Sequence, residues 1–519
     1  MKNFLYHLSL IKSWISAQFS QEKYLHAERF SYPHERLAFS TETPSDNDLL
    51  LGIDEFGRCL QVTTNKKRKQ LGNVLKVAPS QGGKSTGFKH QLKHWKGSVI
   101  VNDIKGELDA ETSDIRAEFS DIYRIDLTGG GNKFDPLMGK ETDDDFYAVA
   151  KLLLYEPNEH QPAFTQRGIE ILTLLFLAAR AAPIPIPPFL FVREVTQLGI
   201  NGAAKRINDI RPSLAKRFVD EDYRASKNYN ENKYLVDSWA SAKARILPFV
   251  TENVVKSLSG SDFRITDLLM GERPVTIYLN WPESKLFALQ PVMKLLWGTF
   301  TSELKDFYDN FVKKHGKKAT AKFWKILFLI DEAGVTPVPE LYNHVSTFNG
   351  RGMFFELGVQ DLPQLEALYG KYYAGTILNN CTQVFFRQKN LETAEYVSRL
   401  LGGKSAFSSS HTTHGDQTSE GKQEQKVPLM TPQEIRGMGD TILIFHPDLR
   451  YAIKAKRMPE FVKSAKGTII PNLQRPVLPV LPEIPLLPVP RLDTWRRASE
   501  AYPLFFAEGE MSNEASLAL

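Results

Sequence analysis

The residues best suited to chemistry lie in a short glycine-bearing run that follows an apolar stretch. Residues 78–85 read Ala-Pro-Ser-Gln-Gly-Gly-Lys-Ser and match the phosphate-loop pattern G-x-x-x-x-G-K-[ST], with Ala78 replacing the first glycine. Such a turn aims backbone N–H groups at phosphates, and the positive end of the following helix lies behind them. The spacing predicts a nucleotide site built from Ala78, Pro79, Ser80, Gln81, Gly82, Gly83, Lys84, Ser85 and Thr86.

Two side chains of this loop have expected tasks. Lys84 would reach the β- and γ-phosphates of ATP, and Ser85 would coordinate Mg²⁺. ATP and Mg²⁺ are therefore the expected cofactors. A chance Gly-Gly-Lys-Ser turn is the alternative, but an apolar strand before the run and a helical pattern after it favour the nucleotide site.

Hydrolysis also needs carboxylates, and Asp331 and Glu332 follow the apolar run Ile326–Ile330. Ligands of α/β sheets bind at the carboxyl ends of the strands, where this pair would lie. Asp331 is expected to hold Mg²⁺ through water, and Glu332 to act as the base that polarises the attacking water. The alternative is an ordinary core strand that ends in a helix-capping carboxylate.

Two further polar residues flank the next predicted strand, Met353–Val359. Gln360 follows the strand, where its amide could sense the γ-phosphate or orient water. Arg351 precedes the strand in Asn349-Gly350-Arg351-Gly352 and could stabilise transition-state charge at a neighbouring subunit's nucleotide. A solvated turn arginine explains Arg351 equally well on spacing alone.

The elements that must position these residues alternate between strand and helix. A helix is expected over Gly83–Trp95, and strands are expected near Leu50 and Leu60. Further strands are expected over the apolar runs Val74–Ala78, Ser98–Val101, Asp121–Leu127, Val275–Trp281, Ile326–Ile330, Met353–Val359 and Thr382–Phe386. This alternation predicts an α/β fold with a largely parallel sheet.

The rhythm is helical between residues 143 and 260, which predicts an all-α domain inserted in the α/β domain. The expected organisation is an N-terminal amphipathic and linker segment (1–46), a nucleotide-binding domain (47–142 and 261–460), the all-α domain (143–260) and a Pro-rich extension (461–519). Residues 404–426, rich in Ser, Thr, Gly and Gln, are expected to form a polar loop.

Composition excludes several protein classes. The chain has 519 residues, 24% of them charged and 42% hydrophobic, and only two cysteines, which rules out a collagen, wholesale disorder and a disulfide scaffold. The net charge of +5 neither demands nor excludes nucleic acid as a partner. The most apolar stretch, residues 169–186, is interrupted by Glu170 and Arg180, so no transmembrane span is expected.

The apolar residues of the N-terminal segment recur at helical spacing, from Phe4 to Phe19. This amphipathic helix could lie flat on a membrane, although a face that packs on a partner or on the core is favoured.

Several motifs resemble those of conjugative coupling proteins, the TraG/TraD-type ATPases of type IV secretion. Asp103-Ile104-Lys105-Gly106-Glu107 looks like their D-x-K-G-E turn, and Phe134-Asp135-Pro136-Leu137 is similar to their F-N-P-L turn. Further similar segments follow in the same order, over about Leu50 to Met458: Asp331-Glu332, Gly350-Arg351-Gly352, Gln360 to Leu365, Asn379-Asn380-Cys381 and Leu429 to Arg436.

The resemblance implies a RecA/FtsK-like P-loop ATPase domain with an inserted all-α domain, assembled as a homo-hexamer around a central channel, with assembly on DNA as one option. It implies that ATP drives relaxase-bound single-stranded DNA to a type IV secretion channel or membrane subunit. By position it assigns phosphate and Mg²⁺ contacts to Lys84 and Ser85, the acidic pair to Asp331 and Glu332, the sensor to Gln360 and the trans arginine to Arg351. Most relatives begin with membrane-spanning helices, whereas no span is expected in this chain. It is therefore expected to be cytoplasmic and peripheral at the inner membrane.

Two other functions stay open. One is an FtsK/HerA-like translocase of double-stranded DNA, against which the D-x-K-G-E turn argues. The other is a nucleotide-gated adaptor that recruits relaxosome or effector proteins with little hydrolysis, against which the Lys84, Asp331 and Glu332 set argues. Candidate DNA contacts are Lys66 to Lys69 and the lysine-rich residues 313–325, although such runs are more often solvated loops.

Overall fold

The computed structural model describes residues 9–10, 12–13, 28–64, 72–154, 162–414 and 417–459. Most of the expected amphipathic segment, the basic run at Lys66 to Lys69 and the Pro-rich extension lie outside these residues. The chain divides into two compact units. Among the described residues, unit 1 contains those up to residue 122 together with 266–279 and 304–459, and unit 2 contains those within 123–265 and 280–303. The domain bounds expected from the sequence remain a prediction.

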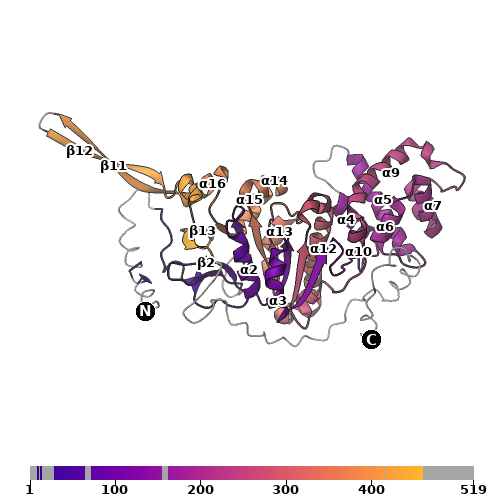
Figure 1. The fold of residues 1–519 in the computed structure, drawn as a ribbon, viewed down its shortest axis with the longest axis horizontal. Coiled ribbons are helices and arrows are strands. Elements are labelled where there is room, and N and C mark those ends of the chain that lie inside the picture. The colour runs from indigo at the N-terminus through magenta and orange to yellow at the C-terminus, as the bar shows by residue number, and fades with distance from the viewer. Residues whose placement is uncertain are drawn as a thin grey trace. The chain divides into compact units, whose positions relative to one another are not determined.

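A twelve-stranded sheet dominates the fold (Figure 1), with the order β1-β3-β2-β14-β13-β10-β4-β9-β8-β5-β7-β6. Its strands are β1 (Ser40–Thr41), β2 (Leu49–Ile53), β3 (Cys59–Val62), β4 (Val74–Val77), β5 (Ser98–Asp103), β6 (Asp121–Asp126), β7 (Val275–Asn280), β8 (Ile326–Ile330), β9 (Met353–Val359), β10 (Thr382–Phe385), β13 (Thr441–Phe445) and β14 (Ile453–Lys456). The strands expected from the apolar runs are all present.

The central strands are parallel and buried on both faces. Strand β4 lies between β10 and β9, and β8 lies between β9 and β5, all in parallel register. Every residue of β4, β8 and β9 is buried, as expected of strands that helices cover on both sides. Strands β13, β14, β2 and β3 extend the sheet in antiparallel register. Because parallel strands end at the same edge, the loops after β4, β5, β8, β9 and β10 meet there.

Helices lie between the strands of unit 1 along the chain. They are α2 (Lys84–His94), α3 (Glu107–Ala117), α11 (Asp267–Met270), α13 (Leu341–Thr347), α14 (Leu362–Tyr369), α15 (Lys371–Asn379), α16 (Leu391–Leu401) and α17 (Pro432–Arg436). Helix α12 (Leu286–His315) precedes β8, and short 3-10 turns occur at η1 (Leu37–Phe39), η4 (Glu283–Lys285), η5 (Lys317–Lys322) and η6 (Phe348–Arg351).

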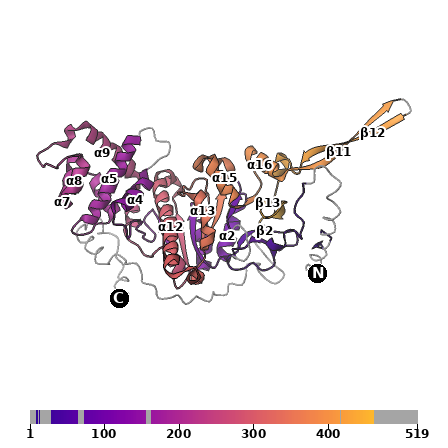
Figure 2. The same ribbon diagram turned by 180° about the vertical axis from the view of Figure 1, so that it is seen from behind.

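Unit 2 is largely helical (Figure 2). Between β6 and β7 its elements are α4 (Asp143–Leu154), α5 (Pro162–Ala181), α6 (Pro188–Thr196), α7 (Ile200–Ile210), α8 (Pro212–Val219), η2 (Tyr229–Glu231), α9 (Lys233–Ile246), η3 (Leu247–Phe249) and α10 (Glu252–Ser257). Helix α5 is the central element, in contact with α4, α6, α8 and α9. Its apolar stretch is a buried core helix, as the sequence predicted. Among the described residues, none of the helices combines the length and the hydrophobicity that a membrane span requires.

The expected polar loop at residues 404–426 is wrong. These residues form a two-stranded antiparallel hairpin of β11 (Gly403–His414) and β12 (Gln417–Pro428), which extends from the end of α16 (Figure 1). The β-branched residues Thr412, Thr413 and Thr418 favour strand in spite of the polar composition of the segment.

Candidate nucleotide-binding site

The predicted phosphate loop connects β4 to α2 at the carboxyl edge of the sheet. Its backbone turns sharply, because Gln81 and Gly83 have positive φ angles of 64° and 94° and Gly82 N–H donates to the Pro79 carbonyl at 2.9 Å. A Cβ atom at Gly82 would lie 2.8 Å from the Pro79 oxygen, so this turn leaves no room for a side chain. Helix α2 begins at Lys84 and aims its first N–H groups at the loop, which gives the geometry of an anion site.

Lys84 and the acidic pair meet above this loop. The Lys84 ammonium lies 3.0 Å from Asp331 Oδ1 and 2.9 Å from Glu332 Oε1, and all three side chains are mostly buried. Lys84 comes from α2 and the carboxylates follow β8, two strands away from β4. The structure thus brings together three side chains that the sequence separates by about 250 positions. Bound phosphate oxygens would compete with these carboxylates for the same ammonium.

Lys84 reaches the carboxylates across a glycine of β9. A Cβ atom at Gly358 would lie 2.8 Å from Lys84 Cδ and 2.8 Å from the ring of Phe88. Gly358 also accepts a 2.6 Å hydrogen bond from Ala333 N–H, directly after the acidic pair. The missing side chain of Gly358 therefore leaves room for the Lys84 side chain, and the Gly358 carbonyl holds the loop after β8 against β9.

The loop that carries the acidic pair is strained and is held by Asn102. Glu332 has a φ of 62°, a conformation that costs a non-glycine residue free energy unless its surroundings impose it. Asn102 is fully buried on β5, and its Nδ2 donates to the Asp331 carbonyl at 3.0 Å and to Thr336 Oγ1 at 2.9 Å. The sequence pattern gave Asn102 no task, because only its position beside β8 shows that it anchors this loop.

A third carboxylate lies beside the pair. Asp103 follows Asn102 on β5 and accepts the Asp109 N–H at 2.8 Å. Burial, and next the negative charge of Asp331, raise the pKa of Asp103 to about 6 against the hydrogen bonds that it accepts. The D-x-K-G-E turn therefore supplies a carboxyl group that titrates close to neutrality at the edge of the site.

The remaining predicted residues fall into two positions. Ser85 and Thr86 lie in the first turn of α2 and Gln360 follows β9, so all three are at the carboxyl edge and half-buried. Arg351 precedes β9 and lies at the opposite edge. Its guanidinium donates to both carboxylate oxygens of Asp309, at 2.9 and 2.7 Å, and to the Thr347 carbonyl. The structure does not bring Arg351 to the phosphate loop of its own chain.

The residues at the loop suit Mg²⁺ chemically. Mg²⁺ prefers oxygen ligands and usually takes one or two from the protein, with substrate phosphates completing the set. The Ser85 hydroxyl, next to Lys84 in the sequence, and the Asp331 carboxylate, 3.0 Å from the Lys84 ammonium, supply such oxygens. Glu332 Oε2 is buried and has no hydrogen-bond partner among the described residues, so it is free to accept one from water.

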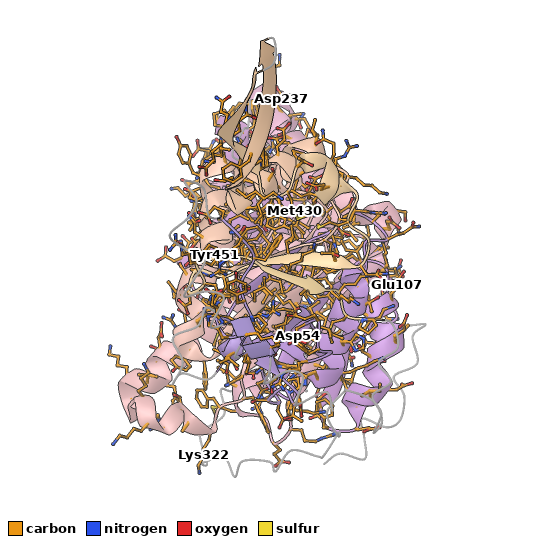
Figure 3. All side chains as sticks on the ribbon, turned by 90° about the vertical axis from the view of Figure 1, so that its left-hand side faces the viewer. Asp54, Glu107, Asp237, Lys322, Met430 and Tyr451 are labelled. Atoms are coloured by element: carbon orange, nitrogen blue, oxygen red, sulfur yellow. The ribbon has the colours of Figure 1, made fainter. Side chains whose placement is uncertain are left out.

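The lysine-rich run lies away from this edge. Lys313, Lys314, Lys317, Lys318 and Lys322 are exposed around the end of α12 and η5, and this segment leads into the amino end of β8. Figure 3 shows Lys322 well apart from Glu107, which begins α3 near the carboxyl edge. A contact between this run and DNA stays a prediction.

Comparison with known proteins gives consistent matches. The family model described as "Type IV secretory system Conjugative DNA transfer" matches residues 54–474. "Conjugal transfer protein TraG" of Escherichia coli is 25% identical over 394 residues, covering 70% of this chain and 61% of the relative. "Protein VirD4" of Agrobacterium fabrum (strain C58) is 25% identical over 414 residues, covering 72% and 57% respectively. The chain thus spans about three fifths of the length of these relatives.

Solved structures share the fold. The plasmid coupling protein TrwB in complex with ADP and Mg²⁺ superposes with a TM-score of 0.59 at 14% identity, covering 85% of this chain and 98% of that chain. A trigonal form of the same coupling protein, with sulphate, gives a TM-score of 0.57. This likeness agrees with the α/β P-loop architecture built around β4 and α2.

Proposed function

The chain belongs to the type IV secretory system conjugative DNA-transfer family, and from this premise we propose that it is an ATP-driven motor that couples relaxase-bound DNA to a type IV secretion channel. The observation that carries the proposal is the contact of the Lys84 ammonium with both Asp331 and Glu332 at the mouth of the phosphate loop. A loop that only bound nucleotide would not require a second acid beside the lysine.

The proposed mechanism gives every group of the site a role. The loop N–H groups and Lys84 hold the phosphates, and Lys84 offsets the charge that develops on them. Mg²⁺, held by Ser85 and through water by Asp331, would neutralise further phosphate charge. Glu332 accepts a proton from the attacking water through its unpaired Oε2, and Gln360 orients that water.

The family and the sequence support a proposal for the partners and the organisation of the chain. Single-stranded DNA with its relaxase is the proposed cargo, and a secretion channel or membrane subunit is the proposed docking partner at the inner membrane. Residues 47–142 and 261–460 would form the nucleotide-binding domain of a homo-hexamer, with residues 143–260 as its all-α domain. TrwB has been crystallised with the ATP analogue ADPNP, which supports nucleotide binding by this fold.

The test is ATP hydrolysis with and without single-stranded DNA. We expect DNA to stimulate the wild-type protein, and Lys84→Ala and Glu332→Gln to abolish turnover. Lys89→Ala is the matched control, because Lys89 lies on the same helix but pairs with Glu111 at 2.5 Å rather than with the acidic pair.

The variants also separate the alternatives. Glu332→Gln should still bind ATP, since it keeps the loop and Lys84. Tight ATP binding without measurable hydrolysis in the wild type would instead support a nucleotide-gated adaptor. Stimulation by double-stranded DNA alone would support a translocase of the FtsK/HerA kind.

A further inference from the structure

Arg457 lies against the phosphate loop on the side away from the acidic pair. A Cβ atom built on Gly83 would be 2.3 Å from Arg457 Nη1, 3.0 Å from its Cδ and 3.3 Å from its Cζ. The guanidinium therefore rests on the backbone of the loop residue directly before Lys84. No sequence motif drew attention to this arginine, which is 373 positions further along the chain than Lys84.

Strand pairing places Arg457 at this edge of the sheet. Arg457 directly follows β14, whose last residue, Lys456, pairs with Thr441 of β13. Because β13 is antiparallel to β10, the start of β13 lies at the carboxyl end of β10, next to β4. The arginine thus arrives at the same edge as the phosphate loop, through three strands added to one side of β4.

Two contacts fix the arginine and the backbone after it. Arg457 N–H donates to the Asp440 carbonyl at 2.8 Å, and Arg457 Nε donates to Asp440 Oδ1 at 2.7 Å. Two residues later, the Pro459 carbonyl lies 2.8 Å from His90 Nε2 on α2. The segment therefore runs alongside the phosphate-loop helix. In the described part of the chain only Nε of this guanidinium donates a hydrogen bond, which leaves Nη1 and Nη2 for a ligand.

The two cations of the loop lie on opposite sides of it. Lys84 points toward Asp331 and Glu332, which belong to the β9 and β8 side, whereas Arg457 arrives from the β10, β13 and β14 side. A polyphosphate on the loop N–H groups has its terminal phosphate at the lysine and the acids, where hydrolysis is proposed. Its inner phosphates then face Arg457.

We propose that Arg457 binds the inner phosphates of the nucleotide held by its own subunit, and that Asp440 positions it for this contact. The inference rests on the proposed nucleotide site and adds a cationic ligand to it. Guanidinium groups suit phosphate because they donate two parallel hydrogen bonds. A contact to the α- or β-phosphate is common to ATP and ADP, so Arg457 should increase the affinity for both nucleotides by the same factor.

The experiment measures binding of fluorescent N-methylanthraniloyl ATP and ADP to the full chain with Mg²⁺. We expect Arg457→Ala to weaken both nucleotides by about tenfold, in line with the loss of a partly exposed charge-assisted hydrogen bond. Arg457→Lys should recover part of the affinity, and Asp440→Asn should cause a smaller loss. Lys454→Ala is the control, because Lys454 is on β14, three residues before Arg457, but lies over the ring of Phe30.

The outcomes are distinguishable. Unchanged affinity for both nucleotides in a folded Arg457→Ala protein would overturn the inference and leave the proposed nucleotide site intact. A loss confined to ATP would also overturn it, because that result places the arginine at the γ-phosphate. A wild-type protein that binds neither nucleotide would overturn the proposed function and the inference with it. Circular dichroism of each variant excludes misfolding as the cause of a loss.

Discussion

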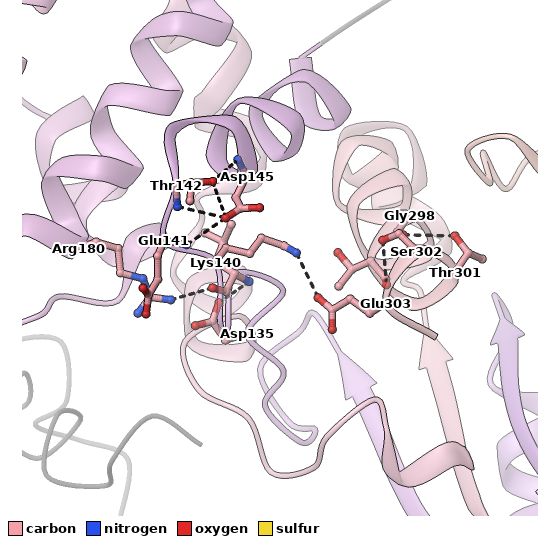
Figure 4. A network of polar contacts seen from close by, with 12 residues as sticks. Asp135, Lys140, Glu141, Thr142, Asp145, Arg180, Gly298, Thr301, Ser302 and Glu303 are labelled. Carbon is pink, nitrogen blue, oxygen red and sulfur yellow. Dashed lines mark hydrogen bonds and ion pairs between the residues drawn. The ribbon is translucent and has the colours of Figure 1, made fainter. Parts of the chain in front are cut away.

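Replacing Asp135 with asparagine should stabilise the protein at neutral pH. Asp135 is fully buried in the Phe134-Asp135-Pro136-Leu137 turn, and burial raises its pKa to about 6 despite the attraction of Arg180 and the hydrogen bond from Leu137 N–H. Figure 4 shows this turn beside Arg180, which donates to the Leu137 carbonyl. Asparagine offers the same acceptor oxygen without a charge, and the F-N-P-L turn of the resembling family has asparagine here.

The magnitude follows from the pKa of this carboxyl. The folded protein holds the Asp135 proton up to about pH 6, whereas an ordinary aspartate loses its proton near pH 3.8. Between these values the folded state binds more protons, so the free energy of unfolding falls as pH rises. This difference between the two pKa values corresponds to a loss of about 3 kcal/mol in the free energy of unfolding, and the loss is complete above pH 7. Asparagine has no proton to lose, so the advantage of Asp135→Asn should grow from about zero at pH 4 to this limit.

The assay is thermal unfolding of the full chain and of Asp135→Asn at several pH values from 4.5 to 8. For a unit of this size the limit corresponds to a rise in Tm on the order of 5–10 °C at neutral pH. Asp145→Asn is a control of opposite sign in the same unit, because the Thr142 hydroxyl lowers the pKa of Asp145 and its contribution is lost as pH falls. A difference between Asp135→Asn and wild type that did not vary with pH would refute the reasoning.

Two further substitutions test residues around the site. Asn102→Ala should lower kcat for ATP by about tenfold and leave KM nearly unchanged, because it frees the Asp331 loop from two buried hydrogen bonds but leaves the phosphate loop intact; an equal loss of nucleotide binding would indicate general unfolding instead. Arg351→Ala subunits mixed with wild type should reduce ATPase activity more than their fraction predicts if the arginine acts on a neighbouring subunit, and activities that simply add would exclude that task.

The parallel core was predictable because its signal is local. Strands buried on both faces, such as β8 and β9, appear as unbroken apolar runs, and a phosphate loop carries its own spacing. The hairpin of β11 and β12 was missed because its two strands pair only with each other. Their sequence is polar and lacks the unbroken apolar run that marks a buried strand. Asn102 and Gly358 were missed for a different reason. Both act on residues far away in the sequence, Asp331 and Lys84 respectively, and only the order of the strands reveals these contacts.

The order and direction of the strands determine whether an arginine can reach the nucleotide of its own subunit, as Arg351 near β9 and Arg457 near β14 show. Sequence spacing placed Arg351 close to a site strand, yet it precedes β9 whereas the site lies after it. Seven strand residues span about 23 Å, and Asp309 holds the arginine at its own edge, so any contact of Arg351 with nucleotide requires a second copy of the chain. Arg457 is remote in sequence but lies on Gly83 of the same chain. In the ring motor that we propose, Arg457 would tie nucleotide affinity to the subunit's own fold, and Arg351 would tie hydrolysis to its neighbour.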